Sequence, residues 1–150
     1  MKNLSIYIVF VVVVVAIGAL IGINNIPGDW YQSLQKPPFN PPNWIFGPVW
    51  TTLYVLIGIA GARMWILRPT GTRMRLWFTQ MALNFLWSPI FFGMQSPIGA
   101  LVIIVPMLIC IIAFIVLNYS RDRISMWLFV PYAVWVSFAT LLNLSITLLN

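Results

Sequence analysis

The sequence predicts an all-α integral membrane protein, a single domain over residues 1–150 in which five transmembrane helices form a bundle. The chain is 61% hydrophobic and only 7% charged, whereas a soluble domain carries roughly 25% charged residues. Its charge-free runs cover residues 3–28, 37–62, 76–120 and 124–150. About 20 apolar residues are needed to cross a bilayer, so the third run has room for two crossings and the total is five.

The first predicted helix covers residues 4–23. Lys2 precedes an apolar stretch from Ile6 to Ile23, as in the start of a secretory signal peptide. That stretch exceeds the roughly 7–15 apolar residues of a signal peptide, and no small-residue cleavage site follows it. We therefore expect the segment to be retained as a transmembrane helix.

A long loop over residues 24–43 is predicted to follow the first helix. Its prolines force extended backbone and stop any helix; they are Pro37, Pro38, Pro41 and Pro42. The loop also carries large apolar side chains that a simple linker does not need, namely Trp30, Tyr31, Leu34 and Phe39. Two interpretations stay open: these side chains anchor the loop in the membrane interface, or the loop is a lid over a ligand pocket.

The other four helices are predicted at residues 44–65, 75–94, 97–117 and 124–148. Pro48 falls in the first turns of the second helix, where proline is tolerated. The last three helices each contain an internal proline, namely Pro89, Pro106 and Pro131. Each of these prolines frees a backbone carbonyl and bends its helix, which opens space inside a bundle.

The distribution of positive charge predicts how the bundle sits in the membrane. Cytoplasmic loops carry an excess of Lys and Arg, and only Lys36 falls on the side of the first loop. The basic residues on the other side are Lys2, Arg63, Arg68, Arg73, Arg75, Arg121 and Arg123. We therefore expect a multi-pass cell-membrane protein with a cytoplasmic N-terminus, and with its C-terminus and first loop outside. The net charge of +6 then reflects topology, and no nucleic-acid partner is expected.

The scarcity of titratable side chains excludes several classes of function. The chain has no His and no Glu, and its acids are Asp29 and Asp122. Most hydrolytic and metal sites need such residues, and proton-coupled export needs an intramembrane carboxylate. The lone Cys110 is interpreted as apolar filler. No metal site and no cofactor are expected, and aromatic rings are the groups left to hold a small molecule.

Polar and aromatic residues recur together on single faces of three predicted helices. These residues are Trp50 and Tyr54 in the second helix, Gln80, Asn84, Trp87 and Ser88 in the third, and Tyr132, Trp135, Ala139 and Asn143 in the fifth. Trp44 stands at the start of the second helix. The pattern is typical of helix packing through interhelical hydrogen bonds. It is also typical of a pocket with aromatic walls and a few hydrogen-bond donors, and the spacing leaves both interpretations open.

Aromatic walls favour a large, planar, apolar ligand. Offset stacking contributes about 0.5–1.5 kcal/mol per pair beyond the burial of area. The absence of His removes the commonest ligand of haem iron, so a metal-free macrocycle fits better. Lys36 is the cation on the loop side that could pair with carboxylates of such a ligand.

Three ordered segments carry a resemblance to a known family. They run from Trp30 to Trp50 (WYQSLQKPPFNPPNWIFGPVW), from Gln80 to Gly93 (QMALNFLWSPIFFG) and from Val130 to Asn143 (VPYAVWVSFATLLN). Together they resemble the tryptophan-rich sensory protein / translocator protein family (TspO/MBR, the peripheral benzodiazepine receptor family). The resemblance covers essentially the whole chain and indicates a prokaryotic member.

The resemblance implies a membrane receptor or sensor that binds porphyrins such as protoporphyrin IX and is linked to tetrapyrrole regulation. It implies a pocket that opens toward the first loop, and frequent homodimers. The implied binding residues are Trp30, Phe39, Trp44, Asn84 and Ala139, beside the pocket tryptophans Trp50 and Trp135. Family members are also associated with light-dependent porphyrin degradation, in which Trp50 and Trp135 would be the catalytic residues.

Two departures from the family pattern limit what is carried over. Pro38 stands where some bacterial members have another tryptophan, so the loop side offers less stacking surface. Leu144 and Thr147 stand where the animal cholesterol motif needs Tyr followed by a basic residue. Four functions stay open: a porphyrin receptor, a light-dependent porphyrin-degrading enzyme, a passive porphyrin or lipid transporter, and a structural subunit whose aromatic residues only pack.

Overall fold

A computed structural model describes the backbone of residues 2–150 and the side chains from Asn3 onward. Within these residues all regular secondary structure is helical. The elements are α1 (Lys2–Asn24), α2 (Asp29–Ser33), a 3₁₀ turn (Asn43–Ile45), α3 (Phe46–Leu67), α4 (Thr72–Ser88), a π-helical turn (Pro89–Gly93), α5 (Pro97–Asn118) and α6 (Arg123–Leu149). The described chain thus has six α-helices where five were predicted, because α2 forms a short turn of helix inside the first loop.

Four stretches are long and apolar enough to cross a membrane, which makes the chain a multi-pass membrane protein. They are Asn3–Asn24, Asn43–Leu67, Pro97–Asn118 and Arg123–Leu149. The remaining long helix, α4, has 17 residues and carries Arg73 and Arg75 in its first turn, so it is shorter and less apolar than the others. A fifth crossing by α4 and its π-helical turn stays a prediction.

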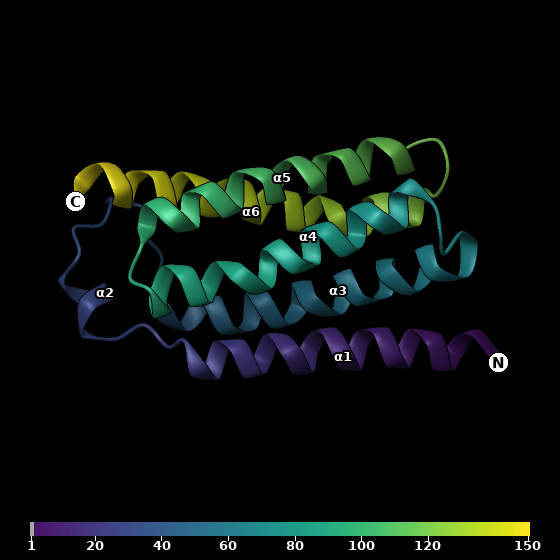
Figure 1. Cartoon of the computed structure of the whole chain (residues 1–150), viewed down its shortest axis with the longest axis horizontal. Coiled ribbons are helices and arrows are strands. Elements are labelled where there is room, and N and C mark those ends of the chain that lie inside the picture. The colour runs from purple at the N-terminus through teal and green to yellow at the C-terminus, as the bar shows by residue number, and fades with distance from the viewer. Residues whose placement is uncertain (1) are drawn as a thin grey trace.

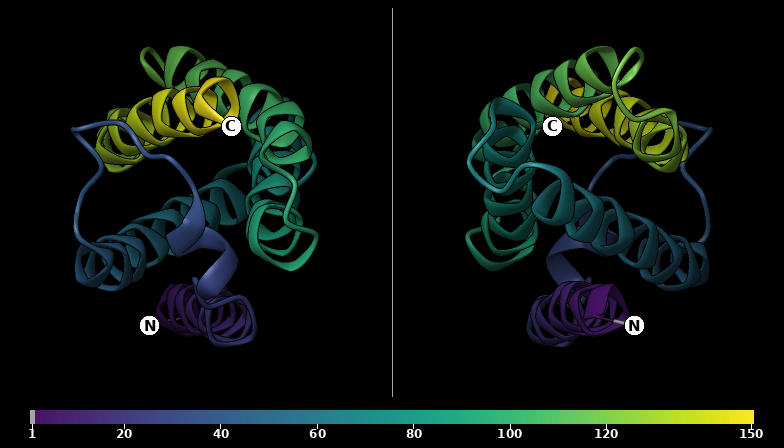
Figure 2. Two further views of the ribbon diagram at one scale, coloured as in Figure 1. Left: turned by 90° about the vertical axis from the view of Figure 1, so that its left-hand side faces the viewer. Right: turned by 90° about the vertical axis from the view of Figure 1, so that its right-hand side faces the viewer.

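The five long helices run side by side along the length of the molecule (Figure 1). α1 packs mainly along α3, while α5 packs against both α4 and α6. The end views place α1 on the outside of the bundle, next to α3 (Figure 2). The first loop with α2, the α4–α5 turn and the C-terminus share one end, which we call the loop end. The N-terminus and the α3–α4 and α5–α6 connections share the other, which we call the arginine end.

Pro89 changes the helix type where the sequence predicts a bend. α4 gives way at Pro89 to a π-helical turn, in which the Met94 N–H donates to the Pro89 carbonyl at 2.9 Å. Gln95 then takes a positive φ of 52° and reverses the chain. The Ser96 hydroxyl accepts the Gly99 N–H at 3.0 Å and caps α5, which begins with Pro97 in the position where proline is favoured. Pro106 and Pro131, in contrast, lie within continuous helices.

Glycine allows α1 and α4 to approach α3 closely. A Cβ atom at Gly58 would lie 2.8 Å from the Cα of Val11, and a Cβ atom at Gly61 would lie 2.5 Å from the Trp77 ring. The Trp77 indole N–H donates to the Ile57 carbonyl at 2.9 Å. The contacts at Gly58 and Gly61 therefore need small residues, as is common where membrane helices pack closely.

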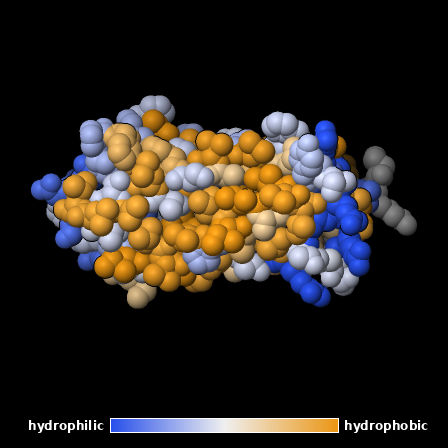
Figure 3. Space-filling model, turned by 90° about the horizontal axis from the view of Figure 1, so that it is seen from above, coloured by the Kyte–Doolittle hydropathy of each residue, from blue (hydrophilic) through white to orange (hydrophobic). Residues whose placement is uncertain are grey.

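The surface is divided along the long axis. On the face drawn in Figure 3, apolar residues cover the middle of the molecule and hydrophilic residues gather at the arginine end. At that end the Arg63 guanidinium donates to both oxygens of Asp122, at 2.9 and 2.8 Å, and Arg73 donates to Asn118 at 2.8 Å. These bonds join α3 to the start of α6 and α4 to the end of α5.

Candidate functional site

A cavity of about 650 Å³ opens at the loop end of the bundle. Its walls come from the last two turns of α1, the first turns of α3, the end of α4 with the π-helical turn, the middle of α5 and the second half of α6. The first loop contributes Pro27, Tyr31 and Asn40 at the mouth. The volume falls within the roughly 300–1,000 Å³ of small-molecule pockets.

The structure brings seven of the predicted site residues into the wall of this cavity. They are Trp44, Trp50, Tyr54, Asn84, Trp87, Trp135 and Ala139. They come from three helices and the turn before α3, so residues 95 positions apart in sequence meet around one space. Within residues 3–150 no charged side chain lines this cavity.

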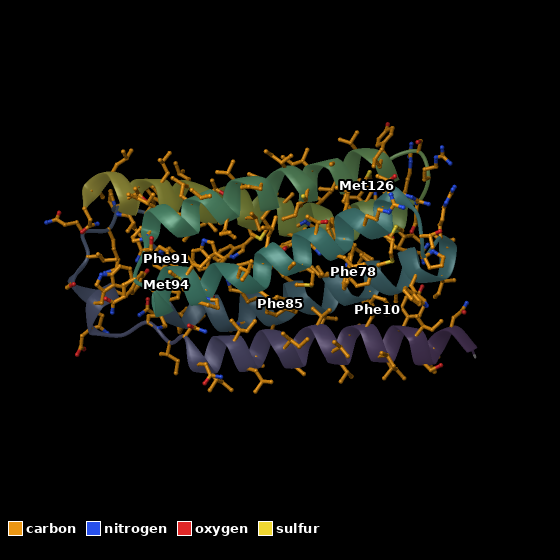
Figure 4. All side chains as sticks on the ribbon, viewed as in Figure 1. Phe10, Phe78, Phe85, Phe91, Met94 and Met126 are labelled. Atoms are coloured by element: carbon orange, nitrogen blue, oxygen red, sulfur yellow. The ribbon has the colours of Figure 1, made fainter. Side chains whose placement is uncertain are left out.

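Aromatic rings in the cavity wall meet one another both edge-on and face to face. Trp50 lies 6.5 Å from Trp135 with an interplanar angle of 86°, and Tyr54 lies 5.6 Å from Trp50. Trp87 stacks on Phe91 with ring centroids 4.9 Å apart. Figure 4 shows Phe91 inside the bundle near the loop end. Such an arrangement presents both ring faces and ring edges to an occupant, and both interact favourably with another π-system.

A chain of hydrogen bonds orients the polar part of the wall. The Tyr54 hydroxyl donates to Asn84 Oδ1 at 3.1 Å, and Asn84 Nδ2 donates to the Tyr132 hydroxyl at 2.6 Å. The Tyr132 hydroxyl in turn donates to Gln80 Oε1 at 2.7 Å. Gln80 and Tyr132 are fully buried and do not line the cavity, although both were predicted to bind ligand. They lie one layer behind the wall and fix the orientation of Asn84.

Trp30 and Phe39, which were also predicted to bind ligand, lie outside the cavity. Trp30 packs edge-on against Phe91, with centroids 5.7 Å apart, and so supports the wall from the loop side. Phe39 remains 45% exposed and contacts Phe138 at 6.2 Å. The sequence pattern placed both residues in the correct loop but could not show which loop side chains face inward.

Trp135 carries a hydrogen-bond donor that no protein group satisfies. Its Nε1 atom is buried and has no partner among the described residues. Trp87, another indole of the wall, instead donates to Asn143 Oδ1 at 3.0 Å. An unsatisfied buried donor costs about 1–3 kcal/mol, and a turn of the Trp135 ring toward an acceptor on an occupant of the cavity would remove that cost.

The contribution of α1 to the cavity was not predicted. Gly18 and Gly22 line it, as does Asn25 directly after the helix. A Cβ atom at Gly18 would collide with the ring of Tyr54. The helix is apolar on every side, so its sequence shows no face that would point inward. The two glycines at a spacing of four are the available signal, and that spacing is typical of close helix packing.

Tyr31 and Asn143 line the cavity as well. Asn143 was recognised on the inward face of its helix, but the sequence did not show that it would hold the Trp87 indole. Tyr31 lies in α2, where burial raises the pKa of its hydroxyl and a hydrogen bond to Asn40 opposes that rise. The neutral phenol is therefore the form that faces the cavity at ordinary pH.

The first loop lies across the loop end and is tied to the C-terminal residue. The Gln35 N–H donates to Asn150 Oδ1 at 3.0 Å, and Asn150 Nδ2 donates to the Gln35 carbonyl at 2.9 Å. Lys36 lies 4.5 Å from the centre of the Tyr31 ring, at the mouth rather than in the wall. The loop therefore borders the cavity. That it acts as a lid over the cavity stays a prediction.

Comparison with known proteins identifies relatives along nearly the whole chain. The TspO/MBR family description matches residues 8–149. The tryptophan-rich protein TspO of Archaeoglobus fulgidus is 46% identical over 81% of this chain and 80% of its own length. Protein CrtK of Rhodobacter capsulatus is 39% identical over 99% of this chain and 94% of its own. The translocator protein of Homo sapiens is 34% identical over 85% of this chain and 80% of its own.

Proposed function

The chain belongs to the TspO/MBR family, and from that membership and the cavity we propose a membrane receptor or sensor for porphyrins of the protoporphyrin IX type. A role as a membrane sensor or receptor agrees with the names of its relatives, which include a tryptophan-rich sensory protein and a translocator protein. The ligand class is the part that the cavity supports. Regulation of tetrapyrrole metabolism would follow from occupancy of the site.

The observation that carries the proposal is the meeting of Trp50 and Trp135 in one uncharged wall. Their rings stand almost perpendicular, with centroids 6.5 Å apart. A flat macrocycle that stacks on one of them receives the edge of the other, and each contact contributes about 0.5–1.5 kcal/mol beyond area burial. The Trp135 Nε1 donor, which has no partner among the described residues, would add selectivity for ligands with an acceptor if a turn of the ring brings it to the cavity.

The charges of a porphyrin fit the mouth rather than the interior. Carboxylates are costly to bury without a partner, and no cation lines the cavity within residues 3–150. Lys36 lies at the mouth, where its ammonium now donates to the Leu34 carbonyl at 3.3 Å. We therefore orient the propionate groups toward the first loop and the apolar ring edge toward Ile104 and Met107, which line the cavity on α5.

Binding can be tested by titrating protoporphyrin IX and following its absorption shift in detergent. Trp50→Phe with Trp135→Phe should weaken binding by about 10-fold to 100-fold. Both substitutions reduce the area of a stacking ring, and the second also removes the Trp135 N–H donor. The matched control is Trp65→Phe with Trp127→Phe, two tryptophans exposed at the arginine end. Equal affinity of both double variants would place the ligand elsewhere.

The adjacency of Trp50 and Trp135 also favours a second function, the light-dependent degradation of porphyrin. A light-excited porphyrin would take one electron from a stacked indole. Dioxygen, the co-reactant, would accept the electron from the reduced macrocycle, and the superoxide formed would add to the ring. The resulting radical-anion adduct would return one electron to the indole radical cation, so that the net reaction joins one dioxygen to the macrocycle. This route needs no acid or base, in agreement with a wall free of charge.

Illumination with dioxygen separates degradation from binding. An enzyme should give a product that free tryptophan in micelles does not give, and Trp135→Phe should abolish it. The same products from protein and from free tryptophan would reduce the reaction to unspecific photochemistry and leave the receptor as the function.

Two further features accompany the proposed function. We infer that the arginine end faces the cytoplasm, since it holds Arg68, Arg75, Arg121 and Arg123 as exposed basic residues. The cavity then opens on the outer side of the cell membrane. We also propose a homodimer, for which the exposed apolar faces of α1 and α5 provide surface within the membrane.

A further inference from the structure

A second hollow lies on the outside of the bundle, between α1 and α4. It is a groove of about 380 Å³ with an almost wholly apolar lining. The lining residues are Val9, Phe10, Val13, Val14 and Ile17 of α1 and Trp77, Phe78, Met81, Ala82 and Phe85 of α4. It shares no residue with the aromatic cavity. Figure 4 shows Phe10 and Phe85 in the space between the two helices.

The groove exists because α1 follows α3 rather than α4. α1 packs along α3 and touches α4 at few points, with Phe10 resting on Trp77 at 5.4 Å. The Tyr54 ring lies against Gly18 and 6.1 Å from Phe85, so it separates the groove from the cavity. The groove is therefore a distinct site that faces the surroundings of the bundle.

Its position in the membrane determines the chemistry of an occupant. The α1 wall belongs to a stretch that is long and apolar enough to cross a bilayer, and Val13 and Phe78 are about half exposed. A hydrocarbon chain is the material that fills such a groove at this depth. Side chains of a helix from a second copy would also pack into such a groove, so the charge at its end decides between a second copy and a lipid.

An unpaired cation stands at the end of the groove nearest the arginine end. Arg75 lies one turn before Phe78 and two turns before Ala82, on the same face of α4. Its side chain is exposed, and within residues 3–150 it has no hydrogen-bond, ion-pair or ring partner. A phosphate at the membrane interface would supply the missing negative charge, since each basic residue near an anionic membrane surface contributes about 1 kcal/mol.

We propose that the groove between α1 and α4 binds one anionic phospholipid, with an acyl chain along Val13 and Ala82 and the headgroup phosphate on Arg75. The site depends on the groove and the cation together. An apolar groove alone would accept any lipid, and an exposed arginine alone would attract any anion. Their alignment on one face of α4 selects an anionic lipid over a zwitterionic one.

Native mass spectrometry of the full chain in detergent tests the proposal, with phosphatidylglycerol and phosphatidylcholine as probes. The wild-type protein should retain one phosphatidylglycerol more tightly than phosphatidylcholine. Arg75→Gln should weaken retention of phosphatidylglycerol about five-fold, the equivalent of one basic contact, and remove the preference. Arg121→Gln is the matched control, because Arg121 is equally exposed but lies in the α5–α6 connection.

Filling the groove should act on both lipids. Ala82→Trp, or Val13→Trp on the facing helix, should abolish retention of either lipid and leave protoporphyrin IX binding unchanged. Soluble glycerol phosphate should not displace the lipid, since it lacks the chain. The proposal is overturned if Arg75→Gln and Arg121→Gln act equally, if glycerol phosphate competes, if groove-filling variants retain the lipid, or if they dissociate a dimer, which would assign the groove to a second copy.

Discussion

Trp135 is a residue of the cavity wall whose indole N–H lacks a hydrogen-bond acceptor among the described residues. Its ring packs against Trp50 and Phe46, yet its buried N–H has no acceptor in the part of the chain that the structure describes. Sequence spacing could predict that Trp135 faces inward, because Tyr132 and Ala139 share its face of α6. It could not predict that Tyr132 is sealed behind the wall, since that depends on how closely α4 and α6 approach.

Gly18 lies directly against the ring of Tyr54. Gly18→Ala should weaken porphyrin binding and destabilise the fold by about 1–3 kcal/mol, because the new methyl group collides with the Tyr54 ring. The tilt of Tyr54 would also lengthen its hydrogen bond to Asn84. Thermal unfolding and the absorption titration measure the two effects.

Gly22→Ala is the internal control for that substitution. Gly22 also lines the cavity on α1, but no atom lies within 4 Å of an added Cβ there. Its alanine variant should keep wild-type stability. Equal stability of the two variants would show that the position of the Tyr54 ring does not depend on the missing side chain at Gly18.

At the scale of elements, charge-free runs and prolines predicted where the long helices lie. The predicted range 97–117 and the observed Pro97–Asn118 differ by one residue, because Ser96 and Pro97 form a cap that can be read from sequence. The range 75–94 instead divides into α4 and a π-helical turn. A proline in the sequence predicts that the α-helix is interrupted. Whether the result is a bend or a π-helical turn depends on the neighbouring helices, which satisfy the freed backbone groups.

The contact between the first loop and Asn150 leads to a prediction about ligand release. Asn150→Ala removes both hydrogen bonds to Gln35 and should speed release of porphyrin about five-fold, if loss of this exposed pair costs about 1 kcal/mol. Stopped-flow measurement of dissociation gives the rate.

Asn24→Ala is a suitable comparison, since the Asn24 side chain bonds only to Leu20 of its own helix. Dissociation from this variant should keep the wild-type rate. Identical rates for all three proteins would show that the loop does not restrain the ligand.

The two ends of the whole molecule differ in structure and in charge. The loop end is open and aromatic, while the arginine end is closed by the pair of Arg63 and Asp122 and by the Arg73–Asn118 bond. The Ser125 hydroxyl also donates to Asp122 at 2.5 Å. A cavity open at one end fits a receptor better than a continuous channel. The count of charges in the sequence predicted this polarity, whereas the pairing of Asp122 with Arg63 required the fold.

This closure predicts a dependence of stability on pH. The hydrogen bonds from Arg63 hold the pKa of Asp122 below its usual value, against the opposing effect of burial. A carboxyl whose pKa is lower in the folded protein stabilises the fold above its unfolded-state pKa of about 3.9. That stabilisation is lost as the pH falls through the folded pKa, so thermal stability should decline below about pH 4.

Asp122→Asn should remove that acid-dependent loss and lower stability at pH 7 by about 1–3 kcal/mol, between the values for exposed and buried ion pairs. Asp29→Asn removes the same charge from the exposed start of α2. It should change neither the stability at pH 7 nor the loss of stability in acid. A pH profile of Asp122→Asn that follows the wild type would assign the acid sensitivity to another group.

The most direct test of the account is fluorine NMR of protein labelled with 5-fluorotryptophan, titrated with protoporphyrin IX. Single Trp→Phe variants assign the eight resonances. Saturable shifts of Trp50 and Trp135, with Trp65 and Trp127 unmoved, are the expected result. Shifts confined to Trp65 and Trp127, or equal shifts of all eight, would contradict an aromatic receptor cavity at the loop end.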